Sequence, residues 1–463
     1  MSPFHAGKRL LLGIILLFPA ILIAQQKTIS LTTLINHATN CLPLLQQKAA
    51  LVEASKAQIT DTKHSFLPQI KLSEQLNMGS DNSISGSYFP FGITPSTSGG
   101  VRADNNFQPA TGNVGVLYGE YELANFGLNS AELNLTKAYA SVAEADLQKE
   151  KYLLELNVAK LYFNIQKSRY RLKADGQNIE RYQSIFNVIQ ALAKSGLRPG
   201  SDSSLAKAEL SKTHVSYNQT LGLLNQQTQQ LSYLTGIPAS EMVIDLPDTN
   251  AINPKLLEMP LLADTGNNPL IDYYSKRSSV YQANQILIKK SYLPKILLAG
   301  STWARGSSIQ YNDKYQSLAD GLGYQRYNYM VGIAATYSLF NDLHKKDKLA
   351  INRYQQQASD YELQQQKLAL ASASLQADNA LQTTAANLLE IPVQLQSAEA
   401  TYQQKLAQYK AGLISLIDLT NASFVLYRSQ TDYIETISDG YLAQLDKAAA
   451  TGSLTQFVNT LKQ

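Results

Sequence analysis

Residues that could carry out catalysis or hold a metal ion are few in this sequence and lie far apart. The 463 residues include one cysteine and five histidines. No two histidines have the His-x3-His or His-Glu-x2-His spacing of a zinc site, and a single cysteine cannot form an internal disulfide. The sequence therefore predicts no metal site and no bound cofactor, and the cysteine is expected to be a buried thiol. These residues are Cys41, His5, His37, His64, His214 and His344.

Motifs for nucleotide binding and nucleophilic catalysis are also missing from the sequence. It contains no Gly-x4-Gly-Lys-Ser/Thr phosphate loop, and no serine, histidine and aspartate stand in a recognisable nucleophile context. Gly321-Leu-Gly323 lacks the third glycine and the strand–turn–helix context of a dinucleotide loop. An enzyme is therefore the least favoured function.

Two aspartates that follow glycine turns are the acidic residues of greatest interest. Asp202 ends the stretch Gly-Leu-Arg-Pro-Gly-Ser-Asp that begins at Gly196, and Asp418 ends the stretch Gly-Leu-Ile-Ser-Leu-Ile-Asp that begins at Gly412. A glycine just beyond a helix is typical of a C-cap. An aspartate just after a turn is typical of a helix N-cap, because its side chain accepts hydrogen bonds from backbone N–H groups.

The composition describes an uncharged but polar surface. Charged residues make up 16% of the chain, with 40 basic and 36 acidic residues, and there are 27 tyrosines. A soluble globular protein carries about 25% charged residues. The net charge of +4 is too small to indicate nucleic acid or an acidic surface as a partner.

The N-terminus has the pattern of an export signal. Lys8 and Arg9 precede fifteen uncharged residues that end at Ala24. This predicts a signal peptide over 1–24, with an N-terminal membrane anchor as the alternative. The rest of the chain has no run of 18 apolar residues, so an exported protein of this kind is expected to be either soluble or inserted as a β-barrel.

The chain contains an internal duplication. His-Ser-Phe-Leu-Pro-Gln-Ile at 64–70 matches Lys-Ser-Tyr-Leu-Pro-Lys-Ile at 290–296, an offset of 226 residues. Further on, the two glycine turns and the Thr-Gly pairs at 235–236 and 451–452 match with an offset of 216. A register held over so many residues predicts two similar repeats, joined by a linker and followed by a tail. The expected bounds are 25–236 and 269–452 for the repeats, 237–268 for the linker and 453–463 for the tail.

Each repeat is expected to contain a helix, two strands, a very long helix and a final helix. Strict alternation of apolar and polar residues predicts the strands, and long proline-poor stretches with helical spacing predict the helices. Pro392 is expected to kink the second long helix. In the first repeat the strands are about 66–78 and 112–124, the loop between them about 79–111, the long helix about 128–195 and the final helix about 203–234. In the second repeat the strands are about 294–304 and 327–340, the long helix about 345–411 and the final helix about 416–450.

The strands have the length and the face pattern of membrane-spanning strands. Each is long enough to cross a bilayer at a tilt, and in the 327–340 strand tyrosines flank an aliphatic middle. Tyrosines and Trp303 near the strands indicate interfacial aromatic belts. Four strands cannot close a barrel, so either the strands lie outside a membrane or several chains share one barrel, and three chains would supply twelve strands. The elements themselves predict an α+β fold class in which long coiled-coil-like helices continue from the strands.

This duplicated order resembles the TolC-like outer-membrane efflux proteins, the outer membrane factors. The motifs that carry the resemblance are Leu67-Pro68 and Leu293-Pro294, the stretches 123–127 and 339–342 that follow the strands, and the two glycine turns. The resemblance implies a homotrimer in the Gram-negative outer membrane, in which a long coiled-coil-like α-helical barrel is continuous with a twelve-stranded transmembrane β-barrel. The helical barrel would form a tunnel in the periplasm. It also implies that an adaptor protein and an inner-membrane pump dock at the helical tips, so that the chain is the exit duct of an efflux or type I secretion system. The alternative is a soluble exported coiled-coil scaffold.

The resemblance also implies roles for residues around the turns. Asp418 would line a narrow acidic aperture that attracts cations, with Tyr409 nearby as either gate or core residue and Asp202 as the counterpart in the first repeat. Many relatives have an acidic residue where Asn421 stands and a basic one where Ile414 stands, so Arg198 on the other turn is expected to supply the missing cation. The implied adaptor contacts are Gly196, Leu197, Gly412, Leu413 and Ser415.

Overall fold

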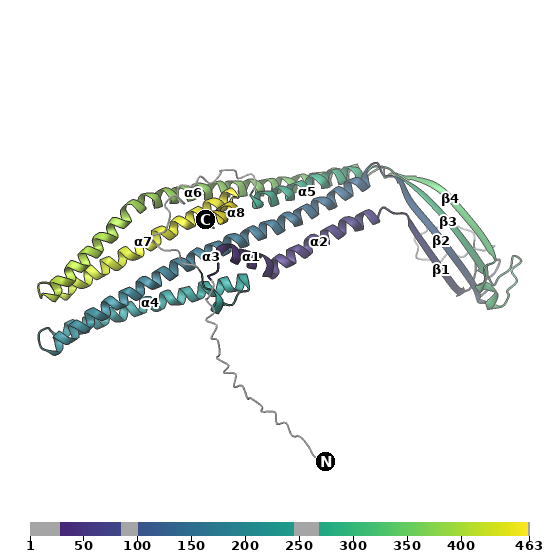
Figure 1. Cartoon of the computed structure of the whole chain (residues 1–463). Helices are drawn as coiled ribbons and strands as arrows, with labels where there is room; N and C mark the ends of the chain where they lie inside the picture. The colour runs from purple at the N-terminus through teal and green to yellow at the C-terminus, as the bar shows by residue number, and fades with distance from the viewer. Residues whose placement is uncertain (1–27, 85–100, 245–267, 462–463) are drawn as a thin grey trace, which may run out of the picture.

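The computed structural model describes residues 28–84, 101–244 and 268–461 of the chain. The predicted signal peptide, the middle of the predicted 79–111 loop and most of the predicted 237–268 linker lie outside the described residues. Figure 1 shows the helices side by side over most of the length of the molecule and all four strands at one end. Two helical turns lie at the opposite end.

The first repeat has the predicted order of elements. A helix of 67 residues, α3, connects the sheet to the first turn and is about 100 Å long at 1.5 Å per residue. The final helix begins at Gly200 and not at 203, because extended Pro199 caps it and ends the turn earlier. The bounds are α1 (Leu31–Cys41), α2 (Pro43–His64), β1 (Gln69–Gly79), β2 (Ala110–Ala124), α3 (Leu128–Lys194) and α4 (Gly200–Thr235).

The second half repeats this order of helix, two strands, long helix and helix. Pro392 lies inside α6, which Figure 1 shows bending toward the second turn. The fourth strand ends at Thr336, short of the expected 340, and α6 begins at Asp342. The bounds are α5 (Pro269–Ser291), β3 (Lys295–Ser307), β4 (Arg326–Thr336), α6 (Asp342–Lys410) and α7 (Leu416–Thr451), with the short 3-10 helices η1 (Ala239–Glu241) and η5 (Leu318–Leu322).

The C-terminal segment is not a loose tail. Residues Leu454–Thr460 form α8, and its Leu454, Phe457 and Val458 side chains are buried. They join the main core, where Phe163 of α3 stacks on Tyr441 of α7 at 5.4 Å between ring centroids. The segment after Gly452 is too short for its apolar spacing to predict a helix. The helix is stabilised by its packing against α1 and α7.

A buried carboxylate joins the two repeats halfway along the helices. Asp175 of α3 is 1% exposed and accepts hydrogen bonds from Thr220 of α4 at 2.6 Å and Tyr427 of α7 at 2.5 Å. The Ser216 hydroxyl donates a third, longer bond at 3.4 Å. Burial, followed by the bond to Asp175, raises the pKa of Tyr427, so its hydroxyl stays a donor. These hydroxyls replace the solvation that the carboxylate loses on burial.

The four strands form one antiparallel sheet in the order β1-β2-β3-β4. Paired residues of antiparallel strands point to the same face. The register pairs Leu72 with Leu117, Leu117 with Thr302 and Thr302 with Tyr329, so the apolar residues of β1 and β4 share one face. We call this the apolar face. The polar face carries Gln69, Lys71, Ser73, Gln75, Glu120, Arg305, Arg326 and Asn328.

One charged residue interrupts the apolar face, and the structure shows its partner. Glu74 of β1 accepts a hydrogen bond at 2.5 Å from the hydroxyl of Tyr324, which precedes β4. Both groups lie over Gly115 of β2, where a Cβ atom would collide with them. The glycine therefore makes room for the one carboxylate on this face.

The predicted aromatic belts need one correction. Tyr327 and Tyr329 lie on the apolar face, but Trp303 pairs with Val116 and Asn328 and so lies on the polar face. Trp303 stands one residue out of phase with the tyrosines, and a shift of one residue reverses the face of a strand residue.

None of the described helices combines the length and the hydrophobicity needed to cross a membrane.

Candidate functional site

The two helical turns lie at the same end of the molecule and share one backbone motif (Figure 1). Gly196 and Gly412 have φ angles of +74° and +76°. In the first turn the N–H of Leu197 bonds to the carbonyl of Leu192 at 2.9 Å, and in the second the N–H of Leu413 bonds to that of Gln408 at 3.0 Å. The glycine N–H groups bond three residues back. Both turns are Schellman C-caps, as the glycine spacing predicts.

The leucines that follow the glycines project from the molecule. Leu197 is 71% exposed and Leu413 is 75% exposed. Neither side chain packs inside the isolated chain. Two exposed leucines at one end form a small apolar surface that a partner could cover.

Asp418 lies in the first turn of α7 but is not its N-cap. Ser415 is the N-cap, and its hydroxyl accepts a bond from the Asp418 N–H at 3.3 Å. The Asp418 carboxylate accepts from the N–H of Ser415 at 3.1 Å and from its hydroxyl at 2.6 Å. This is a capping box, in which serine occupies the cap and the acidic residue comes three positions later. The N-cap prediction for Asp418 is therefore wrong by three residues.

The capping box keeps Asp418 ionised. Hydrogen bonds from the Ser415 hydroxyl and N–H lower the pKa of this exposed carboxyl, and the Lys405 cation lowers it further. Asn421 is exposed one turn further along α7. Ile414 is partly buried against the core beneath the turns and offers no cation.

Asp202 occupies the matching third position of α4. Its N–H bonds to the carbonyl of Pro199 at 3.1 Å, and proline has no side-chain oxygen with which to complete a capping box. The N-cap prediction for Asp202 is therefore also wrong. Asp202 is half-buried and faces the second turn, where its charge acts on Tyr409.

Arg198 and Tyr409 join the two turns. The Arg198 guanidinium lies 5.5 Å from the centroid of the Tyr409 ring, a cation–π distance. Tyr409 is 3% exposed and belongs to the core beneath the turns, as its interpretation as a core residue predicts. Burial raises its pKa, although the Arg198 charge opposes the rise. Among the described residues its hydroxyl has no hydrogen-bond partner.

The structure thus divides the predicted site residues into two groups. Arg198, Asp202 and Tyr409 lie together between the turns. Asp418 bonds to Ser415 and lies near Lys405. The sequence predicted Arg198 as a substitute for the cation that many relatives carry at the position of Ile414, but it did not predict the contact with Tyr409. The capping role of Ser415 was not predicted either, although a serine three residues before an aspartate is the sequence signal for a capping box.

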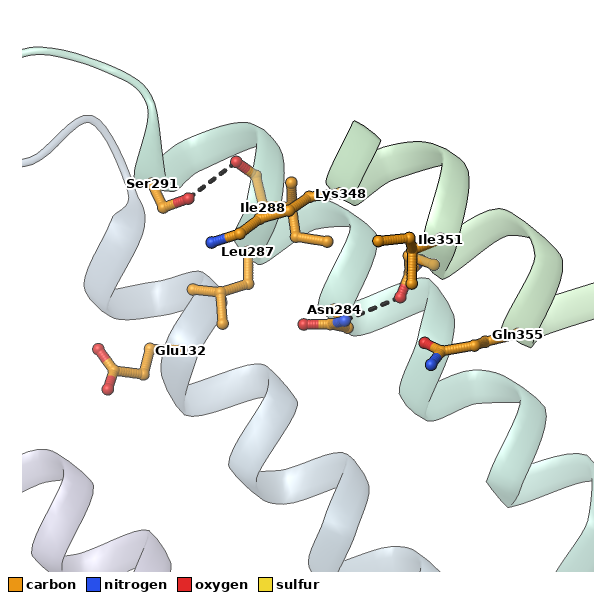
Figure 2. Close-up of a pocket in the computed structure, with 9 residues that line it drawn as sticks. Glu132, Asn284, Leu287, Ile288, Ser291, Lys348, Ile351 and Gln355 are labelled. Carbon is orange, nitrogen blue, oxygen red and sulfur yellow. Dashed lines mark hydrogen bonds between the residues drawn. The ribbon is translucent and has the colours of Figure 1, made fainter. Parts of the chain in front are cut away.

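A second concave feature lies near the sheet end of the helices. A cavity of about 460 Å³ lies between α3, α5 and α6. Figure 2 shows the residues that line it. Asn284 of α5 donates to Asn352 of α6 at 2.8 Å, and Glu132 and Lys348, which occupy matching positions of the two repeats, line it from α3 and α6. The Asn352 amide in turn bonds to the carbonyl of Tyr281 at 2.9 Å. These polar groups serve helix packing and do not converge on a reaction centre.

Cys41 is exposed and not buried as expected. It is the last residue of α1, which ends just before Pro43, and it lies beside Gly236 in the turn after α4. Over the described ranges, no three His, Cys, Asp or Glu side chains come together in a metal-binding arrangement.

Comparison with known proteins identifies the family pattern in the first repeat. The model of the outer membrane efflux protein family matches residues 34–237. That segment runs from α1 to the end of α4 and includes the first turn. No curated protein sequence matches the chain.

Solved structures share the fold over nearly the whole chain. The outer-membrane channel OprN is 18% identical with a TM-score of 0.73, covering 91% of this chain and 90% of its own. VceC from Vibrio cholerae is 15% identical with a TM-score of 0.72, covering 91% and 96%. CmeC from Campylobacter jejuni is 16% identical with a TM-score of 0.71, covering 92% and 86%. At these identities the likeness establishes the fold.

Replacing Ser415 with alanine is expected to remove the capping box and cost about 1 kcal/mol of stability at neutral pH. Because the folded-state pKa of Asp418 is lowered, its contribution is present above the ordinary value of 3.8 and fades as the pH falls through the lowered value. The difference in unfolding temperature between wild type and S415A should therefore be larger at pH 7 than at pH 3. An equal difference at both pH values would contradict the role given to the carboxylate.

Replacing Gly412 with alanine is expected to destabilise the protein by about 1–2 kcal/mol, because a Cβ is strained at a φ angle of +76°. Gly176 is the matched control, since it lies inside α3 with nothing within 4 Å of an added Cβ. G176A should be neutral or stabilising by up to about 1 kcal/mol. Thermal unfolding followed by circular dichroism compares the two. Equal effects would argue against strain at the turn.

Proposed function

Given that this chain is a TolC-like outer membrane efflux protein, we propose that three copies form the exit duct of a tripartite efflux or secretion assembly. The family is one of outer-membrane efflux proteins and not of enzymes. The chain is therefore a Gram-negative outer-membrane protein, with its helices in the periplasm. The trimer, the aperture and the partners are the parts that we propose.

The observation that carries this proposal is an apolar sheet face bounded by two open edges. The described residues form no strand beyond β1 or β4, and every residue of these two strands is exposed. An unpaired backbone group in lipid costs several kcal/mol. β1 and β4 run in opposite directions, so β4 of one copy can pair with β1 of the next in an antiparallel ladder. Three copies of a four-stranded sheet give twelve strands, an even number within the range of known barrels.

The helices offer a matching lateral surface. On α6, five apolar residues with seven-residue spacing, interrupted once, are 60 to 76% exposed. A seven-residue apolar stripe is the seam of a coiled coil. The stripe lies on the side of α6 opposite Ser359 and Asn352, which are buried within the same chain. We therefore propose that α6 packs on the next copy. The stripe consists of Tyr354, Tyr361, Leu368, Leu375 and Leu389.

The opposite lateral edge of the chain provides a surface for that stripe. Leu51 of α2 and Val215 and Leu223 of α4 are about half-exposed. Both helices pack on α3, whereas α6 packs mainly on α5 and α7 of the same chain. A head-to-tail contact of α6 with α2 and α4 closes into a ring together with the strands.

The turns supply the periplasmic end of the proposed duct. In a threefold arrangement we propose that Asp418 and Asn421 line the aperture, where ionised carboxylates favour cations. Arg198 stacked on Tyr409 holds the two turns together beside Asp202 and serves as the latch. Exposed Leu197 and Leu413, with Gly196, Gly412 and Ser415, form the surface for the adaptor protein, which in turn connects to the inner-membrane pump.

Replacing Leu368 with glutamate is expected to break the trimer, because burying a leucine contributes about 1.5–3 kcal/mol at each interface and a buried carboxylate costs more. Ala369→Glu is the matched control, since Ala369 is exposed and lies about 100° around the helix from the stripe. Light scattering after size exclusion in detergent gives the mass. A trimer that survives L368E would contradict the proposed seam.

Conductance in a planar bilayer tests the duct and its aperture. The purified wild type should give small cation-selective currents. Asp418→Ala should lower the cation selectivity, and Arg198→Ala should raise the conductance because the turns lose their cation–π contact, worth about 0.5–2 kcal/mol.

Asp439→Ala is the control for this measurement. Asp439 lies on the same helix but pairs with Lys167 at 3.3 Å. It should leave both selectivity and conductance at wild-type values. If the Asp418 and Arg198 variants give the same currents as the wild type, the proposed aperture is refuted. If the wild type and every variant give no current, the proposed duct is refuted.

A further inference from the structure

Two arginines stand directly opposite each other on the polar face of the sheet. Arg305 of β3 pairs with Arg326 of β4, and the same row continues through Val114 to Gln75. Paired residues in an antiparallel sheet lie close and point the same way. Both side chains are exposed. The two guanidinium groups therefore present a double positive charge on the face that also carries Lys71.

This pair does not stabilise the sheet. Like charges directly opposite each other on neighbouring strands are destabilising. Within the described part of the chain, neither guanidinium takes part in an ion pair, and residues 85–100 contain no acidic residue that could supply one. Arg326 Nη1 donates a hydrogen bond to the carbonyl of the neighbouring Gln325 at 2.9 Å, which leaves its charge unneutralised. Two unneutralised arginines at adjacent positions indicate a role in which the charge is used.

The pair lies toward the end of the sheet that is far from the helices. β3 leaves α5 at Lys295 and reaches Arg305 near its end, and β4 begins at Arg326. Nearer the helices the same face carries Glu120, and also Glu122, which forms an ion pair with Lys295 at 3.5 Å. The charge of the polar face is thus positive at the distal end and balanced by carboxylates at the end next to the helices.

We propose that Arg305 and Arg326 form an anion-selective ring at the outer mouth of the duct, which favours solutes that carry phosphate, sulfate or carboxylate groups. The proposal rests on the proposed trimer, in which the polar face lines the lumen and three copies supply six guanidinium groups. Arginine binds such anions through two parallel N–H···O bonds. Rings of basic side chains select anions in pores.

The outer ring differs in sign from the aperture proposed at the turns. Asp418 offers carboxylates at the periplasmic end, whereas the arginines act at the other end of the molecule (Figure 1). A solute with an anionic group would thus be attracted by the arginines at the outer mouth of the duct. The two ends can be probed separately because a large ion added to one side of a bilayer reaches that mouth first.

Side-specific block of the full-length channel in a planar bilayer tests the ring. Inorganic triphosphate, added to the side of the strand ends in 0.1 M KCl, should block wild-type current reversibly. R305Q/R326Q should weaken the block at least about tenfold, in line with the local enrichment of counter-ions by a charged mouth. K295Q is the control: it removes one positive charge per chain from the same face near the helices, and it should keep the block.

Charge reversal guards against a variant that is merely misfolded. R305E/R326E should lose the triphosphate block and gain a block by spermine from the same side, which a damaged channel would not acquire. Conducting channels with equal triphosphate block in wild type, R305Q/R326Q and R305E/R326E would overturn the ring while leaving the duct intact. Wild-type protein that never conducts would overturn both the duct and the ring.

Discussion

The open edges of the four-stranded sheet are the constraint on which the rest of the structure depends. β1 and β4 expose both faces and, within the described residues, an unpaired backbone edge each, while their apolar side chains share one face. Such a sheet is costly in water because of its apolar face and costly in lipid because of its edges. Pairing β4 of one copy with β1 of another relieves both costs. In the trimer that we propose, the single chain supplies a third of the complete barrel.

The helices follow from the same constraint. Because a long helix follows the second strand of each repeat, α3 continues from β2 and packs beside α2 and α5, and α6 continues from β4 and packs beside α5. The apolar stripe of α6 is exposed on the outer side of the chain, just as the backbone edge of β4 is exposed at the side of the sheet. In the proposed trimer, helical and strand contacts between copies would therefore occur along one continuous boundary. Within each copy, the hydrogen bonds of buried Asp175 join the two repeats.

The charged residues to which we assign roles lie at the two ends of the molecule. Arg198, Asp202 and Asp418 lie at the turns, and Arg305 and Arg326 lie toward the far end of the sheet. Along the helices between them, charged residues form ion pairs such as Lys48 with Asp146 and Lys447 with Asp378. At the turns, backbone geometry comes first: left-handed glycines end the helices, and Ser415 with Asp418 begins the next one. The same carboxylate that completes a cap is thereby left ionised and exposed, which is the state that an aperture lined with negative charge requires.

Sequence patterns alone predict the order of the elements, the lengths of α3 and α6, the apolar faces of β1 and β4 and the glycine turns. Each of these features depends on periodicity or on the local preference of one residue type. The contacts between distant segments become visible only in the folded chain. Arg198 reaches Tyr409 because two turns more than 200 residues apart in the sequence lie together, and Glu74 finds Tyr324 across the sheet. Arg305 and Arg326 face each other through strand register, α8 forms by packing on the core, and Cys41 is exposed because a helix ends there. These outcomes depend on neighbours that no local pattern specifies.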